Sequence, residues 1–137
     1  MKKIIIFCFS VFLSMSAWAV PAVVDYIFDG DTFSAQVMLE GDIAITVRVR
    51  LINIDTPEMN GKCDAEIKMA HSAKDLLVTL IPRGTTVDLR NIKDDKYLGR
   101  INANVILPDG RDLGDIMIDS GLARVYSGGK RKGWCGK

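Results

Sequence analysis

IAITVRVRLINIDTPE, residues 43–58, is the stretch of sequence that decides the fold. Apolar residues occupy every odd position from Ile43 to Leu51, which is the two-residue period of a half-buried strand. The apolar positions then become even, at Ile52 and Ile54. A change of phase inside one β-forming run indicates a bulge or a sharp curl, and curled strands are typical of small barrels.

The same stretch ends in charged side chains. Arg50, Asp55 and Glu58 stand within nine residues, and Pro57 stops the strand. The end of a strand is a place where a scaffold presents chemistry. One cation and two anions at such a place suggest a metal and a phosphate.

More short strands are predicted on both sides of this stretch. Residues 32–39 alternate with the same period, and Glu40-Gly41-Asp42 is expected to turn the chain into residues 43–51. A strand is expected before the Asp29-Gly30 turn, a fourth strand around Val87 and Leu89, and a fifth over residues 101–107. No internal repeat or second domain is visible.

Two helices are predicted between and after these strands. Residues 64–80 carry an apolar stripe, with Asp64 as the expected cap and Pro82 just beyond the end. A shorter helix is expected after Asp112, its cap, and is ended by Gly121. The predicted fold is therefore mainly β with helices: a five-stranded barrel, a helix between strands three and four that covers one open end, and a short helix after strand five. The apolar stripe of the predicted 64–80 helix consists of Ile67, Ala70, Ala73, Leu77 and Leu80.

The first nineteen residues have the parts of a secretory signal peptide. Lys2 and Lys3 precede an apolar run, residues 4–13, that is short for a membrane span, and Ala17-Trp18-Ala19 is a small-x-small ending. We predict cleavage after Ala19, which leaves residues 20–137 as a single domain in the periplasm or the medium. The alternative is an uncleaved membrane anchor.

Removal of this leader changes the charge and the cysteine count. The 18 Lys and Arg lose Lys2 and Lys3 while all 17 acids remain, so the mature chain is close to −1. Any nucleic-acid contact must then come from a few placed cations and not from a general positive field. Cys8 also leaves, and Cys63 and Cys135 are expected to pair in an oxidising compartment. The chain-entropy model gives such a loop roughly 4 kcal/mol of stabilisation.

The shortage of histidine excludes several kinds of hydrolytic site. His71, the sole histidine, falls on the polar face of the 64–80 helix, where a solvated surface histidine is expected. A histidine base or a His-rich zinc site is hard to build here. Carboxylates, arginines and a hard, oxygen-bound cation remain.

Three motifs could carry that chemistry, and each has a plain structural alternative. Asp29-Gly30-Asp31-Thr32 could be only a β-turn, and Asp55-Thr56-Pro57-Glu58 only a strand end stopped by proline. The run from Asp95 to Arg100 could be only a charged turn.

In this order, however, the motifs together resemble the staphylococcal nuclease (thermonuclease) family. The similarity runs from Val23 to Tyr126 and also includes a Pro-Asp-Gly turn and Gly-Leu-Ala-Arg-Val-Tyr. It implies an OB-fold and a secreted, Ca²⁺-dependent endonuclease, with exonuclease action left open, that hydrolyses DNA and RNA with little sugar specificity.

The resemblance also implies roles for individual residues. Asp31, Asp55 and the backbone carbonyl of Thr56 correspond to the calcium ligands, with Asp29 nearby as a supporting residue. The catalytic residues correspond to Arg50, Glu58 and Arg100. Glu58 would orient or deprotonate the attacking water, and the two arginines would neutralise charge on the phosphate.

Substrate contacts are expected beyond this centre. Lys96 and Tyr97 resemble a pair that contacts a terminal phosphate, but the inserted Leu98 is expected to displace Tyr97. Tyr126 could stack on a base or simply pack beside Val125.

The chain departs from the family at its end, where residues 127–137 replace a long third helix. We hypothesise that a Cys63–Cys135 disulfide replaces that packing and steadies the loop after Glu58.

Two other functions use the same residues: a non-catalytic OB-fold module that binds nucleic acid, and a metal-dependent phosphodiesterase of small nucleotides. Degenerate modules usually lose site carboxylates or arginines, so their joint presence favours the nuclease. DNA and RNA are the expected partners, as substrates. No stable protein partner and no membrane contact after cleavage are expected, and the protein is expected to be a monomer.

Overall fold

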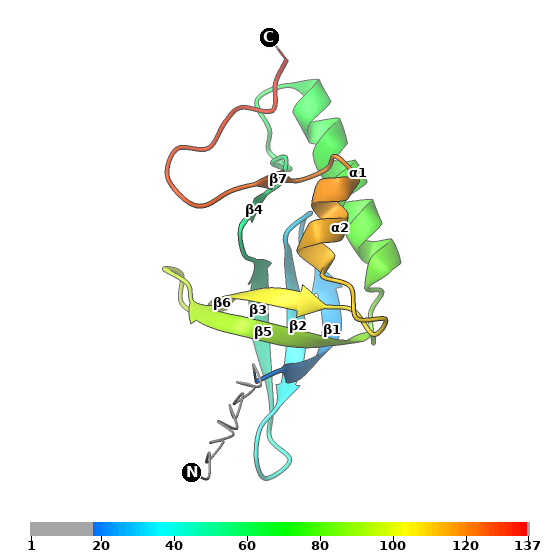
Figure 1. Cartoon of the computed structure of the whole chain (residues 1–137), viewed down its shortest axis with the longest axis vertical. Helices are drawn as coiled ribbons and strands as arrows, with labels where there is room; N and C mark the ends of the chain where they lie inside the picture. Colours follow the sequence, from blue (N-terminus) through cyan, green and yellow to red (C-terminus); the bar gives the residue numbers. More distant parts are fainter. Residues whose placement is uncertain (1–17, 137) are drawn as a thin grey trace, which may run out of the picture.

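The computed structural model describes residues 18–136, so most of the predicted signal peptide lies outside the described residues. Figure 1 shows the course of the described chain. Its elements are, in order, β1 (Val20–Ile27), β2 (Thr32–Met38), β3 (Ala44–Leu51), β4 (Ile54–Asp55), α1 (Asp64–Leu80), β5 (Thr86–Asp94), β6 (Arg100–Ile106), α2 (Leu113–Asp119) and β7 (Arg124–Val125).

Five of these strands close into a barrel in the order β1-β2-β3-β6-β5. The β3–β6 pair is parallel and the other pairs are antiparallel. The predicted five-stranded barrel, with one helix after its third strand and a short helix after its fifth, is therefore confirmed. The antiparallel pair of β4 and β7 stands outside the barrel, and no sequence pattern predicted it.

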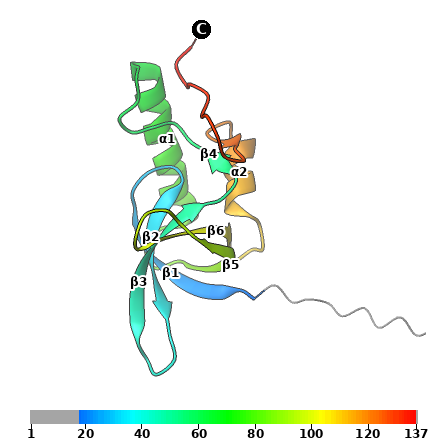
Figure 2. The same ribbon diagram turned by 90° about the vertical axis from the view of Figure 1, so that its left-hand side faces the viewer.

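The barrel core follows the alternation of the strands. Phe33, Ala35, Val49 and Leu51 are almost fully buried, and so is the α1 stripe at Ala70, Ala73 and Leu77. Both helices lie over the same end of the barrel in the two views of Figures 1 and 2. This end also carries the β4–β7 pair and the C-terminal tail, residues 126–136.

The change of apolar phase marks a sharp turn in the backbone. β3 ends at Leu51, Asn53 has a positive φ of 60°, and β4 begins at Ile54. Asparagine tolerates this left-handed conformation better than most residues. Leu51 and Ile54 can therefore both be buried, at 1% and 2% exposure.

Two details of the prediction were wrong. Ile43 is 58% exposed and Leu39 is 47% exposed, because the end of the β2–β3 hairpin projects beyond the barrel, as Figure 2 shows. β6 pairs with β3 only from Arg48 onward, so within residues 18–136 no neighbouring strand covers the tip. In α1 the N-cap is Cys63, which makes no side-chain cap bond, and Asp64 is the first helical residue. By contrast, Asp112 caps α2 as predicted.

No helix in the described residues has the length and apolarity needed to cross a membrane.

Gly30, in the loop between β1 and β2, lies where three segments meet. A Cβ at this position would lie 2.7 Å from the Cβ of Ala73 on α1 and 3.3 Å from the Cβ of Thr56. The absence of a side chain therefore lets the loop pack against both α1 and the segment after β4. This close approach brings the loop that carries Asp31 to the segment that carries Thr56, and both residues line one cavity.

We expect Gly30→Ala to destabilise the protein, because the new methyl group overlaps a helix in a packed region. The expected loss is about 1–3 kcal/mol in the free energy of unfolding, measured by urea denaturation. Gly133→Ala is the control, since a Cβ there meets nothing within 4 Å. Equal stability of the two variants would contradict the packing role of Gly30.

Candidate active site

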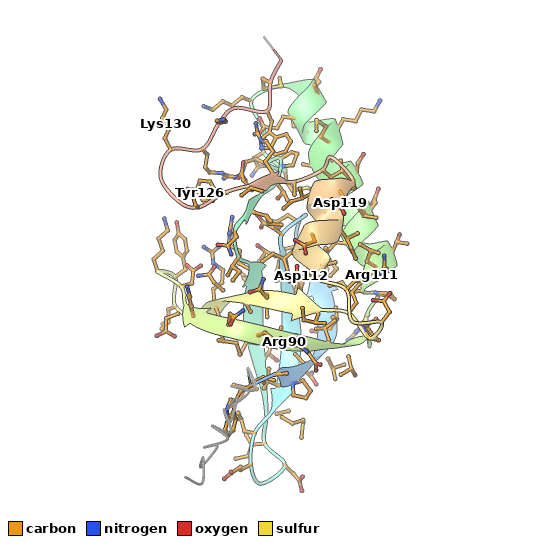
Figure 3. All side chains as sticks on the ribbon, viewed as in Figure 1. Arg90, Arg111, Asp112, Asp119, Tyr126 and Lys130 are labelled. Atoms are coloured by element: carbon orange, nitrogen blue, oxygen red, sulfur yellow. A yellow bond between two sulfur atoms is a disulfide. The ribbon has the colours of Figure 1, made fainter. Side chains whose placement is uncertain are left out.

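A cavity of about 560 Å³ lies where the β1–β2 loop, β3, the segment after β4, the β5–β6 turn and the tail meet. Its lining contains side chains of both charge signs. All the residues that the sequence predicted for catalysis, metal binding and substrate binding line it, except Asp55: Asp31, Arg50, Thr56, Glu58, Lys96, Tyr97, Arg100 and Tyr126. Tyr126 lies on the tail side, as Figure 3 shows.

The Arg50 guanidinium is held by the turn that follows its own strand. Nη1 donates to the carbonyl of Leu51 at 3.1 Å, and Nη2 donates to the carbonyl of Ile54 at 3.2 Å. Nη2 also lies 3.2 Å from Oδ2 of Asp31. These contacts fix the direction of the guanidinium before any substrate is bound.

Arg100 is held by a carboxylate from the preceding turn. Its Nε lies 3.0 Å from Oδ2 of Asp95, and Nη2 donates to Oδ1 of Asp95 at 3.1 Å. Burial opposes ionisation of Asp95, but hydrogen bonds from Arg100 and from the Tyr97 N–H hold its pKa below the ordinary value. The Tyr97 ring covers the other side, with its centroid 4.5 Å from Cζ of Arg100.

The structure places Tyr97 inside the cavity lining despite the inserted residue. Leu98 is fully exposed, so the turn accommodates the insertion outward. Lys96 lies beside the same ring, with Nζ 5.0 Å from its centroid. Sequence reasoning did not assign Asp95 a role. Asp95 lies five residues before Arg100, across a tight turn, and this spacing was the signal from which their ion pair could have been predicted.

Asp31 is a buried carboxylate at the opposite wall. Its Oδ1 accepts a hydrogen bond from the Thr32 hydroxyl at 2.8 Å. Burial raises the pKa of Asp31 to about 6, although the nearby Arg50 opposes this rise. Asp29 accepts from the Asp31 N–H at 3.1 Å and so shapes the loop.

The C-terminal tail brings an arginine into this site that the sequence did not predict. The Arg131 guanidinium contacts Oδ1 of Asp55 and Oε1 of Glu58, and its Nη2 donates to the Thr56 carbonyl at 3.1 Å. Partial burial works against its charge, but its hydrogen bonds to Glu58 and Asp55 raise the pKa of Arg131 above the ordinary value.

The second oxygen of Asp55 also faces the tail. Oδ2 accepts from Nε1 of Trp134 at 3.0 Å and lies 3.7 Å from Nη2 of Arg124. Cζ of Arg124 stacks 3.6 Å above the Trp134 ring. Asp55 is only 3% exposed. These partners lie about seventy to eighty positions away along the chain, where no local pattern could reveal them.

The ligand set predicted for calcium contains only oxygen atoms, which is the chemistry that a hard cation prefers. The Thr56 carbonyl and the Asp55 carboxylate already converge on one cationic group, the Arg131 guanidinium. Asp31 supplies a further carboxylate to the cavity that Thr56 also lines. The residues present therefore fit a hard divalent cation.

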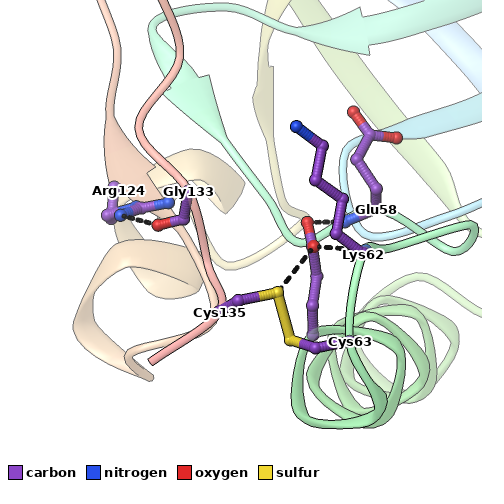
Figure 4. Close-up of a disulfide and its surroundings, with 7 residues drawn as sticks. Glu58, Lys62, Cys63, Arg124, Gly133 and Cys135 are labelled. Atoms are coloured by element: carbon purple, nitrogen blue, oxygen red, sulfur yellow. Dashed lines mark hydrogen bonds between the residues drawn. A yellow bond between two sulfur atoms is a disulfide. The ribbon is translucent and has the colours of Figure 1, made fainter. Parts of the chain in front are cut away.

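A disulfide anchors the tail to the start of α1, as Figure 4 shows. It joins Cys63 and Cys135, whose Cα atoms lie 5.9 Å apart. Glu66 lies beside these sulfurs, but disulfide sulfurs are not thiolate ligands, so this cluster does not form a metal site. The structure thus contains the hypothesised pair.

Glu66 also holds the loop that follows Glu58. Its carboxylate accepts from the Lys62 N–H at 2.9 Å and from the Glu58 N–H at 3.3 Å. A Cβ on Gly61 would lie 2.6 Å from Cγ of Glu66, so this loop passes very close to α1. The backbone of Glu58 and the tail are both fixed at the start of α1.

Comparison with known proteins identifies the family. The model of the family described as "Staphylococcal nuclease homologue" matches residues 48–133, which is more than half of the chain. The chain belongs to this family.

Two similar proteins are each named "Uncharacterized endonuclease". One, from Escherichia coli, is 37% identical over 100 residues, and the other, from Escherichia coli O157:H7, is 36% identical over 100 residues. Each match covers 73% of this chain and 57% of the relative. The chain therefore spans little more than half the length of these relatives.

The match to the staphylococcal nuclease homologues includes Arg131 and the residues that it contacts. It begins just before Arg50 and extends through Glu58, Arg100 and Arg131. Asp31 precedes the matched segment, and the structure brings it to the cavity through the β1–β2 loop.

We expect the stability contributed by Glu66 to depend on pH. The Lys62 N–H is the main cause that lowers the pKa of Glu66 below its ordinary value of 4.5, and the Glu58 N–H adds to it. A lowered carboxyl pKa stabilises the folded state above 4.5, and this stabilisation is lost as the pH falls below that value.

Glu66→Gln should therefore be less stable than the parent at neutral pH. The difference should shrink as the pH falls from about 5 toward about 3, measured by urea denaturation at each pH. Glu40→Gln, in the exposed turn between β2 and β3, is the matched control. A difference for Glu66→Gln that stays constant over this range would contradict the assignment.

Proposed function

We propose that the protein is an exported, Ca²⁺-dependent nuclease that hydrolyses phosphodiester bonds in DNA and RNA with little preference for the sugar. One observation carries this proposal: Arg50, Arg100 and Glu58 line one cavity together with Asp31 and Thr56, two of the three proposed oxygen ligands. The family and the names of the two relatives support it. Endonuclease action is the main expectation, and exonuclease action at free ends uses the same residues.

The two arginines bind the phosphate. Arg50 and Arg100 come from neighbouring parallel strands, and in the register Arg50 lies opposite Asn102, two residues from Arg100. Their guanidinium groups can donate to different phosphate oxygens and neutralise the negative charge that grows as water attacks. Because Asp31 and Asp95 already orient them, little reorganisation is needed at that moment.

Glu58 acts on the attacking water. Its backbone is fixed by Glu66, while its side chain is exposed at the cavity. From there the carboxylate orients the water and accepts its proton. Asp31, Asp55 and the Thr56 carbonyl would hold the calcium ion, which when bound makes the water more acidic and offsets phosphate charge.

Aromatic and basic residues at the cavity edge bind the rest of the strand. Lys96 offers an ammonium group to a terminal phosphate, and Tyr97 lies between it and Arg100. The Tyr126 hydroxyl donates to the Gly129 carbonyl at 2.6 Å, which holds its ring at the cavity for stacking on a base. Single strands and frayed ends, whose bases are unstacked, are the preferred substrates.

Export and removal of the leader are part of the same proposal. We place the signal peptide at residues 1–19 and the nuclease domain at 20–137, acting as a monomer without a stable protein partner in the periplasm or the medium. Intact-mass measurement of the exported protein checks the cleavage site. A retained Met1 end would contradict it.

We expect Arg50→Lys and Arg100→Lys each to lose most turnover, on the order of a hundredfold, because a lysine lacks the bidentate fork. Activity on single-stranded DNA and on RNA is measured with calcium and with a chelator. Arg111→Lys is the control, because Arg111 lies in the exposed turn before α2, outside the cavity lining (Figure 3).

The same assay separates the alternatives. Binding without cleavage would favour a non-catalytic module, and cleavage of only mononucleotide esters would favour a small-molecule phosphodiesterase. Unchanged turnover in both lysine variants would count against the assigned roles of the two arginines.

A further inference from the structure

Arg131 differs from the other cavity arginines in the groups that it contacts. Arg50 contacts one oxygen of a single proposed calcium ligand, Asp31, and Arg100 contacts Asp95, which has no proposed role in binding calcium or the water. Arg131 instead contacts Asp55, the Thr56 carbonyl and Glu58 at the same time. It therefore occupies acceptors that the proposed function assigns to the metal and to the water.

These acceptors cannot serve the guanidinium and a metal ion together. An ion bound at about 2.3–2.6 Å from Asp55 Oδ1 and the Thr56 carbonyl would stand beside the guanidinium that contacts the same two oxygens, and two adjacent cations repel each other. Oδ2 of Asp55 accepts from Trp134 at 3.0 Å, so both oxygens of Asp55 already have a donor from the tail in this arrangement. Metal binding by Asp55 and Thr56 requires Arg131 to leave them.

The tail is built to keep Arg131 in this position. On one side, β7 pairs with β4, which sets Arg124 opposite Asp55. On the other side, the disulfide fixes Cys135 to the start of α1. Between them, Arg124 donates to the carbonyls of Lys132 at 3.0 Å and Gly133 at 3.2 Å. Restraint at both ends gives the guanidinium a high effective concentration at the acceptors.

We propose that Arg131 is an intramolecular competitor of the metal ion for Asp55 and Thr56, so that the tail sets the metal affinity of the site. This inference rests on the proposed metal-dependent function. In the metal-free protein, Arg131 also neutralises Glu58 and keeps it from the attacking water. When a metal ion binds, Arg131 would leave Asp55, the Thr56 carbonyl and Glu58 in one step. Arg131 is therefore a positioning residue that couples metal occupancy to the availability of Glu58.

The test is calcium binding measured by isothermal titration calorimetry on the purified protein. Arg131→Gln removes the competing cation, and the calcium affinity should rise roughly tenfold. Arg131→Lys keeps the charge but loses the fork, so its affinity should lie between the two. This second variant also decides the question if Arg131→Gln does not fold.

Lys130→Gln is the matched control, because it removes the same charge from the adjacent position. Lys130 is exposed and points away from the protein in Figure 3. Its calcium affinity should stay within about twofold of the parent, since a solvated charge is largely screened. An equal rise in Lys130→Gln and Arg131→Gln would show a general charge effect and would overturn the inference.

Trp134 provides a second readout that does not depend on activity. It is the sole tryptophan of residues 20–137, the proposed mature protein. Because its indole donates to Asp55, displacement of the tail by calcium should change its fluorescence. If calcium left this emission unchanged, and if the parent and Arg131→Gln bound calcium with equal affinity, the inference about Arg131 would be overturned. The proposed function would still stand. Failure of both proteins to bind calcium would also overturn the metal dependence of the proposed function.

Discussion

The backbone turns sharply between Leu51 and Ile54, and the rest of the site depends on the position of that turn. Asn53 adopts a positive φ of 60° to make it, which brings the carbonyls of Leu51 and Ile54 to the Arg50 guanidinium. Without the turn, β3 would continue in phase and carry Asp55 along the barrel surface. With it, the chain leaves the barrel, and Asp55 and Thr56 face the loop that carries Asp31.

Charge balance in the site follows from this geometry. Burying several carboxylates together is unfavourable unless cations approach them closely. Asp31 receives Arg50, Asp95 receives Arg100, and Asp55 receives cations from the tail. For Asp31 the effect of burial is larger than that of Arg50, so its pKa is raised. Each of these carboxylates therefore has a cationic partner, and Asp31 and Asp95 in turn orient Arg50 and Arg100.

The barrel, both helices and most of the cavity lining could be predicted because their signals are local. Period-two alternation marks β2 and β3, an apolar stripe marks α1, and Asp112 caps α2. The β4–β7 pair and the contacts of Arg131 could not be predicted, because their partners lie far apart in sequence and only the fold brings them together. The partners of Glu66 are close in sequence, but they are backbone N–H groups, which leave no side-chain pattern to recognise. The burial of Ile43 was predicted wrongly. Alternation shows that a strand has an apolar face, but it does not show that another part of the protein covers that face.

The tail holds its place in a different way from a packed helix. A helix that docks on the core is held by apolar burial, which does not depend on the charge of a neighbouring site. Here a disulfide fixes one end, and the residues before it are held mainly through polar contacts to Asp55, Thr56 and Glu58. Because the energy of such contacts depends on the charge they face, the conformation of the tail must respond to whatever cation or phosphate enters the cavity. The disulfide-linked tail, residues 126–136, is therefore part of the site and not only part of the scaffold.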